Sequence, residues 1–302
     1  MQPVLDVLRT RTALVAILLL AVSSLLPAQS PALGAGERIA DGVVLYRLDD
    51  RGLLDPAGPV AVQALRIDAV KVSLEMGLAE DRVPAREGVQ QIALRRGAIA
   101  AVNGGFFALD DGRPIAMLKA GGRLLGTTRR PRGAVAMTDR HGGVRLLFDR
   151  VSVGTTTETK RHRDPVYETR LGSPAKEWAR ARDAVSGAGL LVLDGRVFDD
   201  WHEEGLSPAF DTTRHPRTMV GVDADHAIWL VTIDGRQPAI SLGMTFTELQ
   251  TLARRLGLRS ALNLDGGGST TMVAGGRIVN HPSDPTGPRP VSDALLVLPR
   301  HR

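Results

Sequence analysis

The chain has 302 residues, of which 43% are hydrophobic and 24% are charged, so it contains enough apolar material for a large folded core. Its net charge of +5 is spread along the sequence and only 4% of its residues are aromatic, which argues against a nucleic-acid-binding surface. The absence of cysteine excludes disulfide bonds, thiolate metal sites and a lipid-modified cysteine.

The N-terminal segment has the composition of a secretory signal. Two arginines precede an apolar run over residues 13–26, which is shorter than the roughly 20 residues that a membrane-spanning helix needs. We therefore predict a signal peptide over residues 1–35, cleaved after Ser30 or Gly34, and a protein that is secreted or held in the cell envelope. An uncleaved signal is the alternative, and it would be the chain's only membrane contact. Residues 36–302 are predicted to form one domain.

Two segments have the pattern of amphipathic helices. The first covers residues 84–96 and is followed by Gly97. The second begins at Thr245, which forms a capping box with Glu248, and its apolar residues recur at helical spacing until Gly257.

Each helix is followed by a short apolar strand and a glycine-rich turn. The strand at 98–102 leads into Asn103-Gly104-Gly105, and the strand at 261–264 leads into Asp265-Gly266-Gly267-Gly268. This repeated order suggests two equivalent halves that bring Asn103 and Asp265 together at strand ends. A chance match of common elements is the alternative.

A turn signal that contains glycine and arginine recurs at residues 121–123, 194–196, 234–236 and 275–277. Apolar or β-branched residues precede each signal, and Asp-Gly and Gly-Gly supply the positive φ that tight turns require, so we predict β-hairpins. The polar stretch over residues 155–170 is predicted to be a surface loop, with a lid over the site as the alternative.

The glycine-rich stretch after Asp265 is the most unusual segment of the chain. Three consecutive glycines cost conformational entropy, which favours a backbone that passes close to another group or several amides that point one way. Such amides could hold a phosphate or a sugar hydroxyl, with Ser269 and Thr270 as further donors and Asp265 as acceptor or base. A tight turn with an Asx hydrogen bond is the alternative. The pattern matches no Walker A loop, dinucleotide fingerprint or nucleophile elbow.

Two further residues are candidates for the same site. The neutral amide of Asn103 could hold a sugar hydroxyl or orient Asp265. Arg217 follows a turn fixed by Pro216, so its planar guanidinium could reach a phosphate, and Thr218 could add a hydroxyl contact. A surface salt bridge is the alternative for Arg217.

No metal or cofactor site is predicted. The histidines lack zinc-type spacing. The groups His202, Glu203 and Glu204, and Asp223 with Asp225, are typical of solvated loops, and a structural calcium ion is the alternative for them.

Five segments carry a family resemblance in their order and spacing: AVNGGFF at 101–107, AGLLV at 188–192, PRTMVG at 216–221, LNLDGGGSTT at 262–271 and RPVSDA at 289–294. Together they resemble the phosphodiester glycosidase family, whose type member, the lysosomal uncovering enzyme, removes N-acetylglucosamine from a mannose-6-phosphate diester. Asp293 stands where many relatives carry Asn, so it is assigned no role.

The resemblance implies an α+β fold with a mixed, mainly hairpin-built sheet and a few packed helices. It also implies a hydrolase: a secreted glycosidase that cleaves the anomeric bond of a sugar-1-phosphodiester in an extracellular or cell-envelope glycan. The expected partner is a carbohydrate or sugar-phosphate substrate, with neither nucleic acid nor a cofactor.

The leaving group of such a substrate is a phosphate monoester, which is already a weak base. Cleavage therefore needs neutralisation of the departing phosphate and an activated water or nucleophile more than it needs an acid. We expect Asp265 to activate water or stabilise an oxocarbenium ion, and Asn103 to orient the sugar or Asp265. The expected phosphate clamp consists of Arg217, Ser269, Thr270 and the amides of Gly266, Gly267 and Gly268. Gly104, Gly105 and Thr218 complete the expected substrate-binding set.

Two other functions remain open from the sequence. One is hydrolysis of a cell-wall or exopolysaccharide glycoside that contains no phosphate. The other is a non-catalytic glycan-binding or exopolysaccharide-assembly factor that uses the same groove. Inhibition by inorganic phosphate would favour the phosphodiester substrate, whereas sugar binding without turnover would favour the non-catalytic factor.

Overall fold

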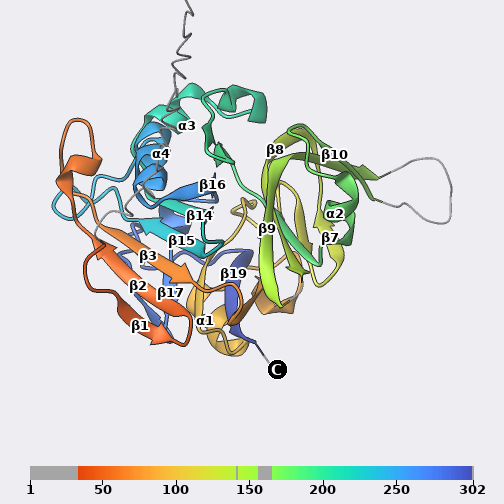
Figure 1. Cartoon of the computed structure of the whole chain (residues 1–302), viewed down its shortest axis with the longest axis horizontal. Helices are drawn as coiled ribbons and strands as arrows, with labels where there is room; N and C mark the ends of the chain where they lie inside the picture. Colours follow the sequence, from red (N-terminus) through yellow and green to blue (C-terminus); the bar gives the residue numbers. More distant parts are fainter. Residues whose placement is uncertain (1–32, 141, 156–164, 301–302) are drawn as a thin grey trace, which may run out of the picture.

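A computed structural model of the chain describes residues 33–140, 142–155 and 165–300 (Figure 1). The predicted signal peptide falls almost entirely on residues 1–32, outside the described residues, and so does most of the predicted surface loop, at 156–164. Among the described helices, none has the length and apolar character needed to cross a membrane.

The described strands form three antiparallel sheets. The eight-stranded sheet has the order β1 (Glu37–Ala40), β2 (Val43–Leu48), β3 (Val62–Ile67), β15 (Ile228–Ile233), β14 (Arg217–Asp223), β16 (Leu258–Asn263), β12 (Leu190–Leu193), β13 (Arg196–Val197). The six-stranded sheet has the order β10 (Pro165–Thr169), β9 (Gly143–Thr155), β8 (Thr128–Arg140), β11 (Asp183–Ser186), β6 (Leu118–Ala120), β7 (Arg123–Gly126). The five-stranded sheet has the order β18 (Arg277–Ile278), β17 (Met272–Ala274), β5 (Ala100–Asn103), β19 (Asp293–Pro299), β4 (Val72–Leu78).

One face of each sheet packs into a shared central core, and a helix covers the other face. The eight-stranded sheet is covered by α4 (Phe246–Arg255), the five-stranded sheet by α1 (Val89–Arg95), and the six-stranded sheet by α2 (Ala175–Arg180). Successive side chains of a strand point to opposite faces, so on β5 Val102 enters the central core while Ala101 packs under α1. The remaining described helices are α3 (Pro208–Thr212), η1 (Arg51–Leu53), η2 (Ala79–Asp81), η3 (Trp201–Glu204) and η4 (Gly267–Ser269).

The helix predicted from Thr245 is confirmed. The Glu248 amide donates to Thr245 Oγ1 at 3.2 Å and the Thr245 amide donates to Glu248 Oε2 at 2.9 Å, which is the predicted capping box. The other predicted helix begins at Val89 rather than at residue 84, because the backbone at Glu87 is extended and pairs with Val291.

Three of the four predicted hairpins are confirmed. The turns at 121–123, 194–196 and 275–277 join β6 to β7, β12 to β13, and β17 to β18. The prediction at 234–236 is wrong, because the chain after β15 continues through a loop toward α4 instead of turning back as a strand. The α+β class is confirmed. Every described strand pairing is antiparallel, however, so the mixed sheet expected from the family resemblance is replaced by three antiparallel sheets.

The two helix-to-turn segments occupy equivalent places in two sheets. Strands β4 and β5, which flank α1, both pair with β19 between them. Strands β15 and β16, which flank α4, both pair with β14 between them. Asn103 ends β5 opposite Ala294, and Asn263 ends β16 opposite Met219. This arrangement fits the two equivalent halves suggested by the sequence, and it brings both glycine-rich turns to strand ends.

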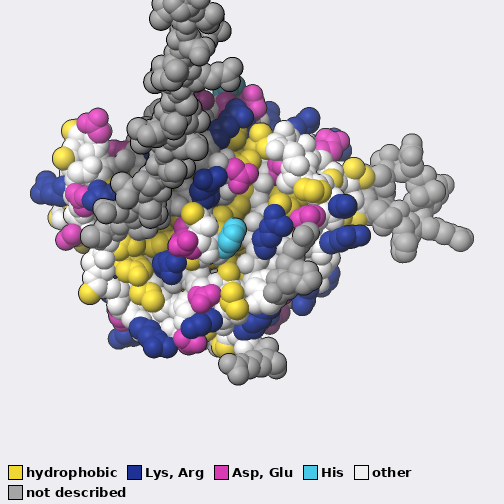
Figure 2. Space-filling model, viewed as in Figure 1, with side chains coloured by type: hydrophobic (Ala, Val, Ile, Leu, Met, Phe, Trp, Pro, Cys, Tyr) yellow, Lys and Arg dark blue, Asp and Glu magenta, His cyan; other side chains and the backbone are white. Residues whose placement is uncertain are grey.

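The surface carries no continuous basic stripe on the face shown in Figure 2, where lysine and arginine side chains are interspersed with acidic ones.

Candidate active site

The two glycine-rich turns meet. Asn103 Nδ2 donates to the Asp265 carbonyl oxygen at 2.7 Å, and the Asp265 amide donates to the Gly104 carbonyl oxygen at 3.1 Å. Asn103 Oδ1 accepts hydrogen bonds from Thr218 Oγ1 at 2.7 Å and from the Thr271 amide at 3.2 Å. Asn103 is only 1% exposed, so it holds the backbone of Asp265 in place from inside the protein. Thr218 supports Asn103 and is fully buried, so it does not present its hydroxyl to a substrate.

Asp265 is the residue that these contacts hold at the junction. It is partly buried, and its Oδ1 accepts a hydrogen bond from the Gly266 amide at 2.8 Å. Burial raises the pKa of Asp265 to about 6, against the lowering effects of the Ser269 hydroxyl, the Gly266 amide and the Arg289 charge. A carboxyl group that titrates near neutral pH suits proton transfer.

A second carboxyl group, that of Asp293, lies on the other side of Gly104. The Gly105 amide donates to Asp293 Oδ1 at 2.8 Å, the Gly104 amide donates to the Asp293 carbonyl oxygen at 3.0 Å, and Ser292 Oγ contacts Oδ2. Burial raises the pKa of Asp293 to about 6, and the Asp293 charge in turn raises the pKa of Asp265. Sequence reasoning assigned Asp293 no role, although it lies in one of the five family segments.

Gly104 allows the close approach of these groups, because a Cβ atom there would lie 2.0 Å from Asp293 Oδ1 and 2.9 Å from Met76 Cε. Gly104→Ala is therefore expected to destabilise the fold by about 1–3 kcal/mol and to lower the melting temperature. Gly154→Ala is the matched control, since a Cβ atom at Gly154 meets nothing within 4 Å. Equal melting temperatures for the two variants would show that Gly104 is not tightly packed.

Arg217 does not fit the phosphate-clamp role predicted for it. Its Nε donates to the Met244 carbonyl oxygen at 2.9 Å, and its Nη2 donates to the carbonyl oxygens of Phe210 at 2.7 Å and Thr213 at 3.0 Å. The guanidinium lies between the rings of Phe210 and Phe246, 5.0 and 4.7 Å from their centroids, and burial lowers the pKa of Arg217 to about 9. Successive side chains of a strand point to opposite faces of the sheet. Because Thr218 points toward Asn103, Arg217 beside it on β14 points to the face covered by α4.

Two arginines lie on the glycine-rich turn. A Cβ atom at Gly268 would lie 2.3 Å from Nη2 of Arg289, which is paired with Asp284, and Arg236 is the other arginine. Gly267 has a φ of +60°, and a Cβ atom there would lie 3.0 Å from Arg236 Nη2 and 3.2 Å from Nη1. Arg236 is exposed and makes no ion pair with any residue that the structure describes. Its Nη2 lies 3.4 Å from His215 Nδ1.

Burial and the charges of Arg217 and Arg236 lower the pKa of His215. The lowered pKa keeps the imidazole neutral, so that it can accept a hydrogen bond from Arg236.

The other two glycines of this turn also lie against protein atoms. A Cβ atom at Gly266 would lie 2.6 Å from the Pro216 carbonyl oxygen, and one at Gly268 would lie 2.1 Å from Asp284 Oδ1. Asp284 forms a two-point ion pair with Arg289, at 2.8 and 3.2 Å. Of the amides predicted to bind phosphate, that of Gly266 donates to Asp265 and that of Gly267 donates to Pro216, so both are already used within the protein.

Ser269 and Thr270 lie beneath the turn. Their exposed fractions are 0% and 1%, and neither hydroxyl has a hydrogen-bond partner among the described residues. The Ser269 hydroxyl is close enough to lower the pKa of Asp265, so it acts on the carboxyl group rather than at the surface. This burial does not fit the direct phosphate contact predicted for the two hydroxyls.

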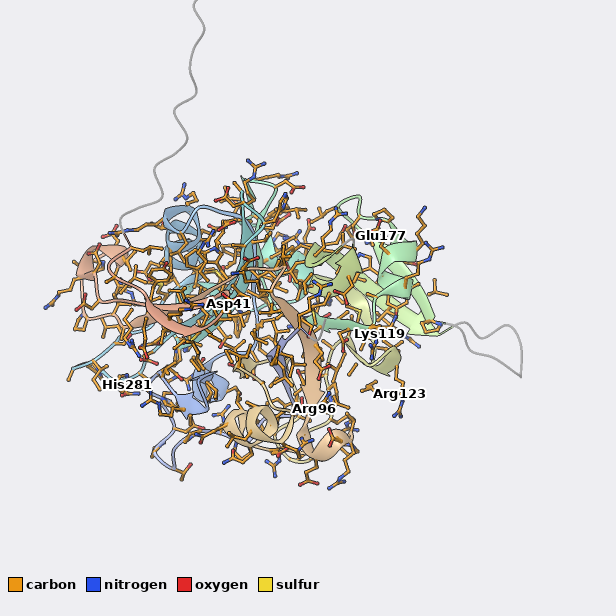
Figure 3. The ribbon with its side chains drawn as sticks, turned by 60° about the horizontal axis from the view of Figure 1, so that its bottom comes forward. Asp41, Arg96, Lys119, Arg123, Glu177 and His281 are labelled. Carbon is orange, nitrogen blue, oxygen red and sulfur yellow. The ribbon has the colours of Figure 1, made fainter. Side chains whose placement is uncertain are left out.

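A buried cluster around Asp234 fixes the far side of the turn. The Asp234 carboxylate accepts from Asn280 Nδ2 at 3.0 Å, from the His281 amide at 2.9 Å and from Gln63 Nε2 at 3.2 Å. Asn280 Nδ2 also donates to the Thr270 carbonyl oxygen at 3.1 Å. The exposed ring of His281 also contacts this carboxylate, with 3.0 Å between His281 Nδ1 and Asp234 Oδ2. Figure 3 shows His281 well separated from Lys119. No local sequence pattern indicates this cluster, because Asp234-Gly235 is typical of a hairpin turn.

The acidic groups considered for calcium have protein partners instead. Asp223 accepts from the Asp225 and Ala227 amides and from Trp229 Nε1. Glu204 accepts from Arg150 Nε at 3.0 Å. In the described part of the chain, no group of three or more histidine, aspartate or glutamate residues is arranged to hold a metal ion.

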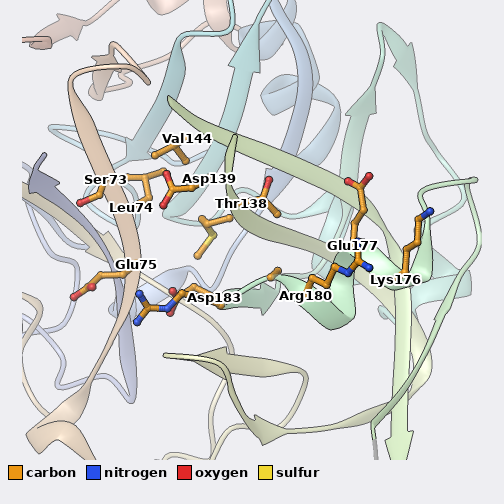
Figure 4. Close-up of a pocket in the computed structure, with 13 residues that line it drawn as sticks. Ser73, Leu74, Glu75, Thr138, Asp139, Val144, Lys176, Glu177, Arg180 and Asp183 are labelled. Carbon is orange, nitrogen blue, oxygen red and sulfur yellow. The ribbon is translucent and has the colours of Figure 1, made fainter. Parts of the chain in front are cut away.

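Cavities also lie away from the glycine-rich turns, and two of them exceed 600 Å³. One, of about 610 Å³, lies between β4, β8 and α2, and Glu75, Asp183 and Arg180 line it (Figure 4). The other, of about 1080 Å³, is lined by residues that include Phe148 and His226. Asp183 Oδ1 accepts from two backbone amides, those of Met76 and Gly121, which is a structural arrangement. Asp265, Asp293 and Arg236 all lie at the glycine-rich turns, which makes the turns the better candidate for chemistry.

The family model described as phosphodiester glycosidase matches residues 96–298. N-acetylglucosamine-1-phosphodiester alpha-N-acetylglucosaminidase from Mus musculus is 27% identical over 217 residues, which cover 69% of this chain and 37% of that protein. The Bos taurus protein of the same name is 26% identical over 208 residues, covering 66% and 35%. The chain thus spans little more than a third of the length of these relatives.

Solved structures show the same fold. A hypothetical protein from Synechocystis superposes with a TM-score of 0.69 at 18% identity, covering 88% of this chain and 63% of that one. The zebrafish N-acetylglucosamine-1-phosphodiester alpha-N-acetylglucosaminidase catalytic domain, auto-inhibited by its pro-peptide, superposes with a TM-score of 0.63 at 21% identity. That match covers 90% of this chain and 87% of the zebrafish chain.

Proposed function

The chain belongs to the phosphodiester glycosidase family, and on that premise we propose that it hydrolyses the bond between the anomeric carbon of a sugar and the oxygen of a phosphodiester. The observation that carries the proposal is that Asp265 and Arg236 both lie at one glycine-rich turn. Asp265 is a partly exposed residue whose carboxyl group has a pKa of about 6, and Arg236 lies against Gly267 without a carboxylate partner among the described residues.

In the proposed reaction, water adds to the anomeric carbon and the bond from that carbon to the phosphate oxygen breaks. The phosphate monoester leaves with the bonding electron pair, and the Asp265 carboxylate takes a proton from the water. Arg236 balances the charge of the departing phosphate with its planar guanidinium, and neutral His215 orients Arg236. Water is the only co-reactant that these steps require.

Asn103 serves as a positioning residue in this proposal. Its amide joins the backbone of Asp265 to Thr218 and Thr271, so it fixes the direction of the Asp265 carboxyl group without contacting the sugar. Arg217 supports the same region from the opposite face of β14, where its guanidinium holds three backbone carbonyl groups.

The same proposal places the reaction outside the cytoplasm, on an extracellular or cell-envelope glycan. The support for this location is the apolar run over residues 13–26, which follows two arginines and precedes small residues. Mass spectrometry of the exported protein would test it, because a cleaved signal predicts a mature N-terminus near Ser30 or Gly34.

A substrate panel tests the proposed reaction. The full chain is incubated with sugar-1-phosphodiesters and with plain glycosides of the same sugars, and released sugar is measured. We expect release from at least one phosphodiester and inhibition of that release by inorganic phosphate. Release from plain glycosides alone would overturn the phosphodiester substrate, and binding of sugar without any release would overturn the proposed hydrolysis.

The two buried carboxyl groups set the expected pH dependence. Burial raises the pKa of Asp265 to about 6, so kcat/KM should rise as the pH increases through about 6 and Asp265 loses its proton. The Asp293 charge contributes to that raised pKa, so in Asp293→Asn the acid limb should move to lower pH. A pH–rate profile of both proteins checks this. An unchanged acid limb in Asp293→Asn would show that the two carboxyl groups are not coupled.

A further inference from the structure

Two arginines of β8 have no carboxylate partner among the described residues, and one of them, Arg132, lies beside the candidate site. Arg130 and Arg132 belong to the sequence Arg129-Arg130-Pro131-Arg132, at the end of β8 that lies beyond its regular pairing with β9 (Figure 1). The register between the strands shifts there, from Thr128 opposite Val153 to Arg132 opposite Val151. Such bulges re-aim side chains and often lie next to active sites. Neither Arg130 nor Arg132 forms an ion pair with a residue that the structure describes.

Arg132 lies beside the Asn103 turn. Its guanidinium is over the ring of Phe106, 5.3 Å from the centroid, and Phe106 directly follows Gly104-Gly105. Its Nε is buried and has no hydrogen-bond partner in the described chain. Burial is the largest influence on the pKa of Arg132 and lowers it, whereas the charges of Glu204 and Asp265 raise it. Arg132 is therefore within the electrostatic reach of Asp265.

Arg130 lies next to Arg132 and over Gly205. A Cβ atom at Gly205 would lie 2.2 Å from Arg130 Nη1, and the charge of Arg130 acts on Arg132. The nearby carboxylate of Glu204 does not neutralise them, because its oxygens accept from Arg150 Nε at 3.0 Å and from three backbone amides, those of Gly133, Gly189 and Leu190. Because neither arginine has an ion-pair partner among the described residues, two like charges held near each other favour an anion beside them.

We propose that Arg130 and Arg132 bind a second phosphate group of the substrate, apart from the one that Arg236 meets. The proposal rests on the proposed function and narrows its substrate class to a glycan that carries phosphodiester groups in successive repeats. Arg236 would then meet the phosphate that leaves, while Arg130 and Arg132 hold the phosphate of the next repeat. A planar guanidinium pair offers the several fixed donors that phosphate oxygens accept.

The test is a binding measurement on the full chain with Asp265→Asn, which binds without turnover. The probes are one repeat of a sugar-1-phosphodiester, with one phosphate, and two repeats of the same compound, with two. We expect the second phosphate to tighten binding about tenfold or more at low salt, and to tighten it less as salt is raised. Titration calorimetry gives both dissociation constants.

Arginine variants separate the site from general charge. In Arg130→Ala and in Arg132→Ala, the two-repeat probe should bind no better than the one-repeat probe. Arg129→Ala is the matched control and should keep the gain, because Arg129 lines a small cavity with Ser152 and Glu168 instead. Arg130→Ala also serves as the variant that leaves the fold intact, since Arg130 is exposed whereas Arg132 packs on Phe106.

The outcomes distinguish this inference from the proposed hydrolysis. Equal dissociation constants for the two probes would overturn the second phosphate site. So would an Arg129→Ala variant that loses the gain in binding of the two-repeat probe as fully as Arg130→Ala and Arg132→Ala do. Both results would hold even if the wild-type chain hydrolyses both probes. A gain that is lost only in Arg130→Ala and Arg132→Ala would support the site even if no probe is hydrolysed. A two-repeat probe with carboxylates in place of the second phosphate should show a smaller gain, and an equal gain would overturn the assignment to phosphate.

Discussion

Replacing Asp265 with Asn is expected to lower kcat on a sugar-1-phosphodiester by about a thousandfold or more. The amide has the size of the carboxyl group and can still accept from the Gly266 amide, so the turn should keep its shape. It cannot take a proton from water or balance positive charge at the anomeric carbon. Initial rates at pH 7.5, where Asp265 is ionised in the wild type, measure the loss.

Asp225→Asn provides the control for this substitution, because the Asp225 side chain is 86% exposed and lies outside the site. We expect it to retain the wild-type kcat. Circular dichroism and melting temperature of both variants establish that the fold is preserved. If Asp265→Asn kept kcat within tenfold of the wild type, Asp265 would have no part in the chemistry.

Replacing Arg236 with Ala should lower kcat/KM by about a hundredfold to a thousandfold, since a positioned cation on a developing anion contributes a large share of catalysis. The loss should be larger for a phosphodiester than for a glycoside of the same sugar with an uncharged leaving group. Arg236→Lys should recover part of the activity, because it keeps the charge and loses the planar two-point contact. Steady-state kinetics on both substrates measure these effects.

Arg277→Ala is the matched control for Arg236→Ala. Arg277 is also an exposed arginine after a Gly-containing turn, but its turn is the confirmed hairpin between β17 and β18. It should leave kcat/KM unchanged. Equal losses for the two variants, or an equal loss on charged and uncharged leaving groups, would contradict a role of Arg236 at the phosphate.

Local sequence signals predicted the parts of the fold that depend on neighbouring residues. The capping box at Thr245 and Glu248 and the stop at Gly257 specify α4 without help from distant segments. The hairpin turns depend on glycines with positive φ, and three of the four were predicted correctly for that reason. The hairpin prediction failed at Asp234. The Asp234 carboxylate is buried and accepts hydrogen bonds from Asn280 and Gln63, which lie far away in the sequence.

The meeting of the two glycine-rich turns was also open to prediction, since the same order of elements occurs twice. The roles of single side chains were not. Arg217 and Thr218 are neighbours on β14, and only the pairing of β14 with β16 and the contact from Asn103 decide which of them faces the turns. Asp293 enters the site through the pairing of β19 with β5, and its contact with Gly105 joins residues 188 positions apart, which no local pattern encodes.

The central claim is that the bond from the anomeric carbon to oxygen breaks, rather than the bond from phosphorus to oxygen. Hydrolysis of a sugar-1-phosphodiester in water enriched in oxygen-18, followed by mass spectrometry of both products, tests it directly. We expect the label in the released sugar, at the anomeric position, and none in the phosphate monoester. Label in the phosphate product would identify a phosphodiesterase and contradict the assignment of Asp265 and Arg236 to glycoside cleavage.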